Sequence, residues 1–282
     1  MNLKLSGSVP NFQSDGLSIT ATEPWFKVKV QLIQSYLQAF MMNASQKTTE
    51  IIFVDLFSGS GLYSCGHKKE IFAGACLASL TAETPFQHRI FCEEDADHAR
   101  ALDKRVRKFF PDQQVTVLNV RHHEWMESLQ SIIPPSKPGY KVAVICLADP
   151  FSMNIPFSAV NKLAALGYSF LIPFTFPLNT RVDCRYYSQE HPDMLKKYIG
   201  DGNYERLAVV ESNVHFYRKL VRMYQNNMLV MGQNSALSSH KLDSRMMELP
   251  AYYIGFFSKQ FSTQAIQRDV NVSEHLQFEL FK

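Results

Sequence analysis

An apolar run of strand length, residues 51–54, ends in an acid and leads into a pair of glycines. Asp55 is the acid, and Gly59 and Gly61 follow with one residue between them. A continuous apolar run containing Ile and Val suits a central parallel strand covered on both faces, because a half-exposed strand alternates apolar and polar residues. Glycine tolerates backbone angles that side chains forbid, so the chain can turn sharply and approach a bound molecule. The run therefore predicts a buried strand of an α/β sheet that feeds a ligand loop at its carboxyl end.

The spacing of the glycines excludes two common phosphate-binding loops. The dinucleotide fingerprint G-x-G-x-x-G is absent, and no Gly-Lys-Ser/Thr ends a Walker loop here. The pattern Asp-Leu-Phe-x-Gly-x-Gly instead resembles the first motif of class I S-adenosylmethionine-dependent methyltransferases. The resemblance implies that Asp55 helps to hold the cofactor's ammonium group and that Phe57, Gly59 and Gly61 belong to the cofactor site. A turn without a ligand is the alternative interpretation of a lone Gly-x-Gly.

Composition places the chain among ordinary globular proteins. It has 282 residues, of which 46% are hydrophobic and 20% charged, enough for one catalytic-size α/β domain with a helical elaboration. A net charge of +3 is too small to indicate nucleic-acid binding. The five cysteines are scattered and never spaced as Cys-x-x-Cys, so neither a disulfide framework nor a zinc cluster is indicated. Without a signal-like segment or an apolar run of spanning length, we expect a cytoplasmic protein.

Hydrophobic periodicity divides the chain into four parts. We expect a flexible N-terminal arm at residues 1–22, a Rossmann-like core at 23–177, a helical insertion at 178–250 and C-terminal strands that complete the sheet at 251–282. Strands are predicted at residues 88–95, 115–120, 141–148, 168–174, 251–259 and 275–281, and helices at 26–43, 72–80, 96–110, 123–133 and 156–166. The polar segment 62–70 could line the ligand site or act as a lid.

Acidic and amide side chains end two of the predicted strands. Glu93 ends the second strand, where a carboxylate can accept hydrogen bonds from both ribose hydroxyls of an adenosine ligand. Asp95 equally suits the N-cap of the helix that follows. Asn119 lies at the end of the third predicted strand and is our candidate for the contact with the adenine amino group, with an ordinary turn residue as the alternative.

A second group of candidate residues follows the fourth predicted strand. Asp149, Pro150 and Phe151 resemble the Asp/Asn-Pro-Pro-aromatic motif of amino methyltransferases, in which the side-chain oxygen and a proline carbonyl hold the target amine. The chain departs from that motif because only one proline is present. Asp149 could instead be a general base or a turn residue before the next helix.

Residues 178–250 combine cations with aromatic rings, a mixture that can contact phosphates and stack on bases. A solvated helical subdomain is the plainer interpretation, because acids are also present. The region carries the following residues: Arg181, Arg185, Lys196, Lys197, Arg206, Arg218, Lys219, Arg222, Lys241 and Arg245, with Tyr186, Tyr187, Tyr198, Tyr204, Phe216, Tyr217 and Tyr224.

The chain as a whole resembles the three-Cys-motif partner (TcmP) group of bacterial methyltransferase-like proteins, from residue 25 to its end. The matching pieces are Lys29 with residues 32–33 and 36–37, and then residues 54–61, 74–80, 91–95, 149–151, 195–200 and 252–259. Ser58, Ser60 and Met153 depart from the residues usual in that group. The resemblance implies a class I methyltransferase fold, meaning a mostly parallel seven-stranded sheet with an antiparallel last strand and a helical insertion before the last two strands. It also implies a bacterial or phage-linked setting and a three-Cys-motif protein as a partner.

Three classes of function compete on this basis. The leading hypothesis is an enzyme that transfers a methyl group from S-adenosylmethionine to a nitrogen or oxygen nucleophile, possible acceptors including nucleic acid. The second is a binding or regulatory module that keeps the fold without transfer activity, in bacterial phage defence. A metal-dependent hydrolase that uses Glu93, Asp95 and Asp149 is the third. A C5-cytosine methyltransferase, a family that begins with the same Asp-Leu-Phe-x-Gly-x-Gly pattern, is disfavoured, because the Pro-Cys that this family carries after the fourth strand is absent.

Overall fold

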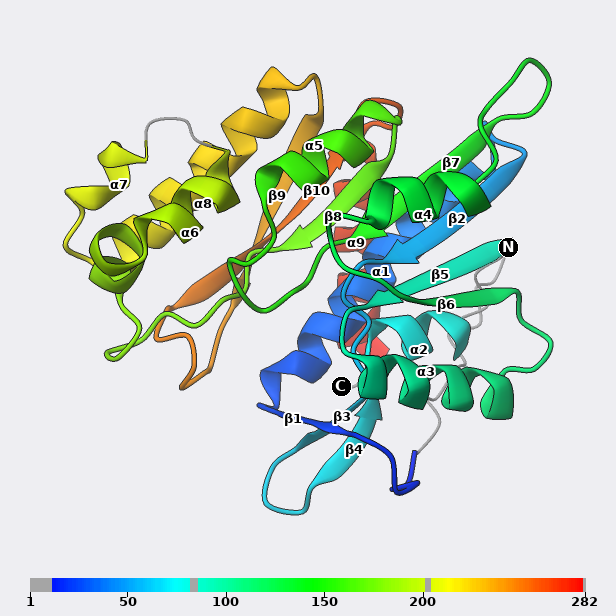
Figure 1. The fold of residues 1–282 in the computed structure, drawn as a ribbon, viewed down its shortest axis with the longest axis horizontal. Helices are drawn as coiled ribbons and strands as arrows, with labels where there is room; N and C mark the ends of the chain where they lie inside the picture. Colours follow the sequence, from blue (N-terminus) through cyan, green and yellow to red (C-terminus); the bar gives the residue numbers. More distant parts are fainter. Residues whose placement is uncertain (1–11, 82–85, 201–203, 281–282) are drawn as a thin grey trace. The chain divides into compact units, whose positions relative to one another are not determined.

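The structure is a computed structural model of the chain that describes residues 12–81, 86–200 and 204–280, with side chains as far as residue 271 (Figure 1). The chain forms two compact units. Of the described residues, the first unit comprises 12–81, 86–121, 135–143 and 270–280, and the second comprises 122–134, 144–200 and 204–269.

A mostly parallel seven-stranded sheet, with helices, makes up the α/β fold that the sequence predicts. Its strand order is β6-β5-β2-β7-β8-β10-β9. Pairing is parallel in β2–β5, β5–β6 and β7–β8, whereas β10 is antiparallel to both β8 and β9. The strands span Glu50–Asp55 (β2), His88–Glu93 (β5), Val115–Asn119 (β6), Val142–Leu147 (β7), Ser169–Pro173 (β8), Asn234–Lys241 (β9) and Ala251–Ser258 (β10).

In the first unit, β2 and β5 are buried along almost their whole length, as continuous apolar strands require. The helices are α1 (Trp25–Ala44), α2 (Ala75–Thr81) and α3 (Ala96–Phe109). Helix α1 packs against α2, and Gln34 Nε2 donates a hydrogen bond to the Ala78 carbonyl at 3.0 Å. The prediction of a long amphipathic helix before the glycine loop is confirmed.

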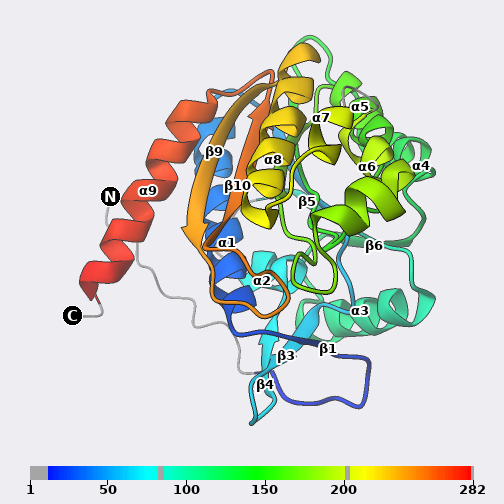
Figure 2. The ribbon, with the colours of Figure 1, turned by 90° about the vertical axis from the view of Figure 1, so that its left-hand side faces the viewer.

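A second, three-stranded sheet in the first unit was not predicted. It consists of β1 (Thr20–Thr22), β3 (Leu62–Cys65) and β4 (Glu70–Ala73) in the order β1-β3-β4, and Figure 2 shows it beside the start of α1. Residues 62–70, the segment expected to line the ligand site or act as a lid, form most of the β3–β4 hairpin. The helix predicted at 72–80 begins only at Ala75, because Phe72 and Ala73 belong to β4.

The expectation of a flexible arm is wrong for the described residues 12–22. Phe12 is buried, and β1 pairs in parallel with β3 through Thr20–Tyr63 and Thr22–Cys65. The segment is rich in polar residues and shows no periodicity, but backbone pairing to a neighbouring strand needs neither. Residues 1–11, which the same expectation covered, lie outside the described residues.

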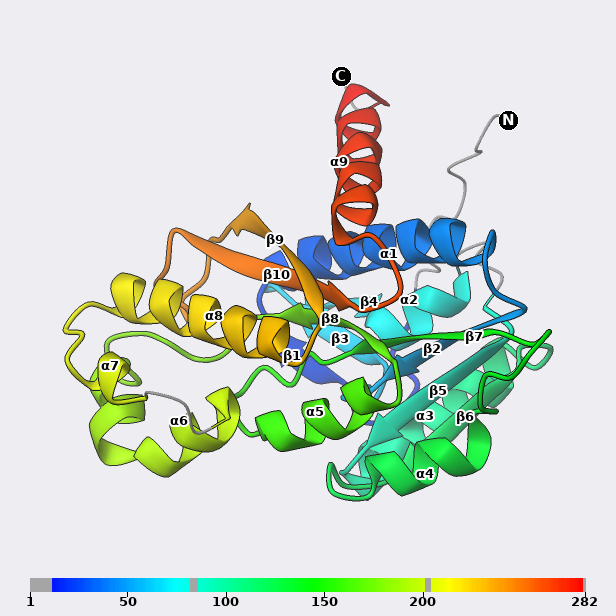
Figure 3. The same ribbon diagram turned by 90° about the horizontal axis from the view of Figure 1, so that it is seen from above.

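The second unit combines the larger part of β7 with β8, β9 and β10 and a set of helices. Helix α8 runs along β9 and β10 (Figure 3). The helical segments are α4 (Trp125–Ile132), α5 (Phe157–Ala165), the π-helix η1 (Tyr186–Glu190), α6 (Pro192–Ile199), α7 (Glu205–Ala208) and α8 (Asn213–Val230). These include the predicted helical insertion before the last two strands.

The last two strands are β9 and β10, and only β10 matches a strand predicted from the sequence. The strand predicted at 275–281 is wrong as far as residue 280, because helix α9 spans Thr263–Leu280. The missing strand is β9, Asn234–Lys241, which lies inside the segment 178–250 that was predicted as a helical insertion. In the sequence, residues 275–280 alternate polar and apolar, which is the pattern of a half-exposed strand, but the helix that begins at Thr263 continues through them. Strand β9 lies at the edge of the sheet and is polar at most positions, so it lacks an apolar run.

Candidate functional site

The glycine loop begins at the carboxyl end of β2, where Asp55 shapes the turn. The Asp55 side chain is only 3% exposed, and its Oδ1 accepts a hydrogen bond from the Phe57 backbone N–H at 3.1 Å. Ser58 Oγ donates to the Asp55 carbonyl at 3.1 Å, and the Ser58 N–H donates to the Cys92 carbonyl at 3.0 Å. The acid that the sequence placed in the cofactor site therefore also determines the shape of the loop.

Gly59 and Gly61 both have left-handed backbone, with φ of +59° and +83°, but their surroundings differ. A Cβ added at Gly59 would meet only the Tyr63 hydroxyl, at 3.7 Å, so this side of the loop is open. A Cβ added at Gly61 would lie 2.8 Å from side-chain carbons of Leu77 and Leu102. Gly59 thus leaves space for a ligand, whereas Gly61 permits close packing of the loop against α2 and α3.

Glu93 joins the glycine loop to the end of β5. Its Oε2 accepts a hydrogen bond from the Gly59 N–H at 2.7 Å, and its Oε1 accepts one from the Asp95 N–H at 2.8 Å. Each carboxylate oxygen has a further lone pair, so these bonds leave capacity to accept from hydroxyl groups. The side chain is half-buried. The structure thus places the predicted ribose acceptor directly beside the glycine loop.

Asp95 and Asn119 support the same region. Asp95 Oδ1 accepts hydrogen bonds from the N–H groups of Asp97 and His98, both at 2.9 Å, so Asp95 is the N-cap of α3. These bonds hold the pKa of Asp95 below its ordinary value. Asn119 Nδ2 donates to the carbonyls of Glu93 and Glu94, each at 2.9 Å. An adenine amino group would donate to the Asn119 Oδ1 instead. The contact between Asn119 and adenine therefore stays a prediction.

Two cysteines lie against the loop, and the sequence did not single them out. Cys76 Sγ donates to the Ser58 carbonyl at 3.4 Å. Burial, with a contribution from the Asp55 charge, raises the pKa of both Cys76 and Cys92, so both stay protonated and act as packing groups. All five cysteines of the chain are buried and free.

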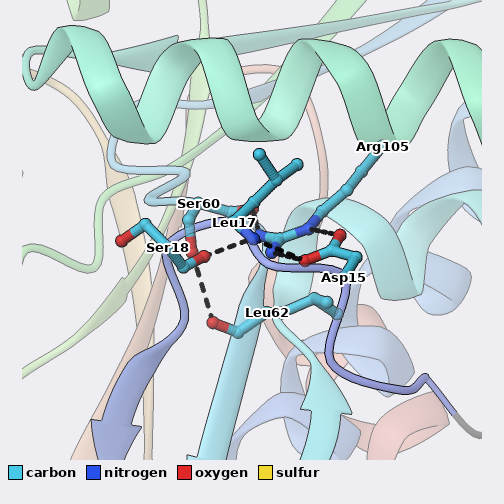
Figure 4. A network of polar contacts seen from close by, with 6 residues as sticks. All are labelled: Asp15, Leu17, Ser18, Ser60, Leu62 and Arg105. Carbon is cyan, nitrogen blue, oxygen red and sulfur yellow. Dashed lines mark hydrogen bonds and ion pairs between the residues drawn. The ribbon is translucent and has the colours of Figure 1, made fainter.

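Arg105 is a further residue of this region that sequence reasoning missed. Its side chain is fully buried on α3, and its guanidinium donates to the Ser60 carbonyl in the glycine loop at 2.6 Å (Figure 4). An arginine on a helix carries no signal of such a role, because only the fold brings residue 105 to residue 60.

Asp149, Pro150 and Phe151 follow β7 and lie in the second unit, whereas the predicted cofactor residues are brought together in the first. Thr175 is 2% exposed, and its Oγ1 donates to Asp149 Oδ1 at 3.0 Å. Phe151 has a φ of +48°, which is rare for a bulky side chain and costs about 1–3 kcal/mol. Strained backbone of this kind is typical of functional sites.

The basic and aromatic residues of 178–250 separate in the structure. Most of the rings form the core of the second unit, where Phe176 lies 5.7 Å from Tyr187 and from Tyr217 between ring centroids. The buried members of the predicted set are Tyr187, Tyr198, Phe216, Tyr217 and Tyr224. The cations stay at the surface, and the exposed ones are Arg181, Arg185, Lys197, Arg206, Arg218, Arg222, Lys241 and Arg245. Buried rings cannot stack on bases, so the stacking part of the prediction is wrong for these five.

Within the described ranges, no group of three or more His, Cys, Asp or Glu side chains is arranged to hold a metal ion. No helix in the described part of the chain is both long and apolar enough to cross a membrane.

Comparison with known proteins shows the fold and no family. No protein-family profile and no curated protein matches the sequence. Protein LPL1258 from Legionella pneumophila, of family DUF519, is similar in structure with a TM-score of 0.54 and 10% identity over 88% of this chain and 91% of that chain. The METTL16 methyltransferase domain is also similar, with a TM-score of 0.48 and 12% identity over 87% and 75% of the two chains. At such identities, likeness shows the fold and not the chemistry.

Proposed function

We propose that the first unit binds S-adenosylmethionine and that the protein transfers its methyl group to a nitrogen or oxygen nucleophile. One observation carries the proposal, namely the hydrogen bond from the Gly59 N–H to Glu93 at 2.7 Å. It places an acid at the end of one parallel strand beside a glycine loop at the end of the next, where open α/β sheets bind ligands.

The residues present fit an adenosyl ligand. Glu93 has the remaining lone pairs to accept from two ribose hydroxyls, and Gly59 leaves the loop backbone open to a bound molecule. Asp55 supplies negative charge for an ammonium group, and Phe57 is half-buried beside it. The bound cofactor would supply a sulfonium that is already an activated methyl donor. The protein's part is then to orient the acceptor and to exclude water.

For the acceptor, we propose the residues that follow β7. Asp149 accepts a hydrogen bond from the buried Thr175 hydroxyl, which restricts the carboxylate to one orientation. An oriented carboxylate can accept a hydrogen bond from an amine or hydroxyl and can take its proton. Phe151 would contact the acceptor with its ring, and its strained backbone supports a role beyond packing.

The proposal extends to the cellular location, the protein partner and the methyl acceptor. We infer that the protein is a TcmP-type methyltransferase of a bacterial cytoplasm that acts with a three-Cys-motif partner. The exposed cations of residues 178–250 support contact with phosphate groups, and hence a nucleic-acid acceptor, through charge rather than stacking. A regulatory partner without transfer activity is the alternative.

Calorimetry with S-adenosylmethionine and S-adenosylhomocysteine tests the cofactor site. Glu93→Gln should weaken binding by about 10- to 100-fold, the value of hydrogen bonds to a charged group. Glu94→Gln is the matched control, because Glu94 is adjacent and exposed and pairs only weakly with Arg121 at 3.3 Å. Equal affinities for wild type and both variants would remove Glu93 from the site, and no binding to wild type would contradict the proposed function.

A transfer assay separates enzyme from regulatory module. Wild-type protein with methyl-labelled cofactor should label a component of a bacterial extract, and ribonuclease, deoxyribonuclease and protease treatments identify its class. Asp149→Asn should abolish labelling and leave S-adenosylhomocysteine affinity unchanged. Cofactor binding without labelled product in the wild type favours the regulatory alternative.

A further inference from the structure

Arg105 is a buried cation whose partners all lie in the first unit and include the glycine loop. Its side chain is 0% exposed, and such a charge is stable only when its donors are satisfied. The Nε donates to Asp15 Oδ2 at 2.8 Å and NH2 donates to Asp15 Oδ1 at 2.7 Å, a bidentate pair. The NH1 group donates to the carbonyls of Ser18 at 2.9 Å and Ser60 at 2.6 Å. Figure 4 shows the guanidinium surrounded by these partners.

The partners come from three places in the chain. Asp15 and Ser18 lie just before β1, Ser60 lies between the two glycines of the loop, and Arg105 lies on α3. The Asp15 carboxylate holds the guanidinium plane through two bonds, and that plane then directs NH1 at the Ser60 carbonyl. The segment before β1 thus determines where the guanidinium meets the glycine loop.

The bond to Ser60 fixes a peptide plane in the loop. The peptide between Ser60 and Gly61 is trans, so its carbonyl and the Gly61 N–H point in opposite directions. Holding the carbonyl toward Arg105 therefore fixes the direction of the Gly61 N–H. On the other side of that glycine, the Gly74 N–H donates to the Gly61 carbonyl at 2.8 Å. Both peptide planes of Gly61 are held by groups outside the loop.

We propose that the Asp15–Arg105 pair is a positioning device for the glycine loop, so that cofactor affinity depends on the segment 15–18 being in place. The proposal rests on the function proposed above for that loop. It goes further in assigning to the N-terminal segment a control over the cofactor site. By reciprocity, a bound cofactor stabilises the docked segment.

Binding and hydrogen exchange of the full chain test the proposal together. Asp15→Asn keeps the size of the side chain and removes its charge, and Arg105→Lys keeps the charge and removes the planar fork. We expect each to weaken S-adenosylhomocysteine binding roughly fivefold or more, the lower end of typical coupling between sites. Exchange of the amides in residues 58–62 should become faster in both. Asp15→Glu, which keeps the charge, should recover part of both properties.

Asp103→Asn is the matched control. Asp103 pairs with Arg107 on the same helix at 2.9 Å, but that pair is exposed and has no bond to the loop. The control should change neither affinity nor exchange in residues 58–62. The proposal is overturned if Asp15→Asn lowers the melting temperature while affinity and loop exchange stay at wild-type values. If the wild type binds no cofactor, the proposed function fails, whereas loop exchange still decides whether the pair positions the loop.

Discussion

At Gly61, the backbone angle and the packing both exclude a side chain. Its φ is +83°, and an added Cβ would come within 2.8 Å of Leu77 and Leu102. Gly61→Ala should destabilise the protein by about 2–5 kcal/mol, from left-handed strain plus overpacking. Gly66→Ala is the matched control, since Gly66 has a φ of +71° and nothing within 4 Å of an added Cβ. Urea denaturation should show that Gly66→Ala lowers the free energy of unfolding only by the backbone strain. Equal losses of unfolding free energy in the two variants would contradict the packing role of Gly61.

The Asp15 carboxylate makes part of the folding stability depend on pH. Hydrogen bonds from Arg105 lower the pKa of Asp15 from its ordinary 3.8 to about 2. A lowered pKa in the folded state means that the pair contributes stability above the ordinary pKa and loses it as the pH falls through the folded value. Melting temperature should therefore drop between pH 4 and pH 2 more steeply in wild type than in Asp15→Asn. Parallel pH profiles for the two proteins would show that this pair does not titrate with folding.

Some residues of the candidate site could be recognised from their sequence neighbours, and others could not. Glu93 and Asp55 could be recognised from sequence, because each ends a strand and the end of a strand is set by neighbouring residues. Arg105 and Thr175 could not, because their partners lie at Ser60 and Asp149 and only the fold brings them together.

At the scale of the element, the β3–β4 hairpin contains an unfavourable turn residue. Lys69 is exposed and has a φ of +48°, and its N–H donates to the Gly66 carbonyl at 3.1 Å. Lys69→Gly should stabilise the protein by about 0.5–1 kcal/mol, because glycine adopts this region without a steric cost. Lys68→Gly should destabilise it slightly instead, because glycine there only adds entropy to the unfolded chain. Chemical denaturation measures both, and destabilisation by Lys69→Gly would contradict the strain.

Elements were predictable where their pattern was long or wholly apolar. Helix α1 and strands β2, β5, β7 and β8 all follow such patterns, and the prediction of each is confirmed. The short strands β1, β3 and β4 and the polar strand β9 were missed. A short strand has too few residues to show a period, and its stability comes from its neighbours rather than from its own side chains.

At the scale of the whole molecule, ligand binding should raise the free energy of unfolding. A ligand that binds only the folded state stabilises it by about 2.7 kcal/mol at 100 times its dissociation constant. S-adenosylhomocysteine at that excess should therefore raise the melting temperature of wild type. In Glu93→Gln the same ligand concentration should raise it less, and Glu94→Gln should behave as wild type. An equal rise in all three proteins would indicate binding away from Glu93.

The sequence by itself determined the mostly parallel α/β sheet, the glycine loop after β2 and the acid at the end of β5, because apolar runs, glycines and strand-ending acids are local signals. It also indicated a helical insertion before the last two strands. Only the tertiary structure decided which segments are those strands, that aromatic rings of residues 178–250 are core rather than surface, and that Asp15 and Arg105 hold Ser60. Strand pairing at the sheet edge, core packing and buried charge pairs all involve residues far apart in the chain. A local sequence pattern therefore cannot predict them.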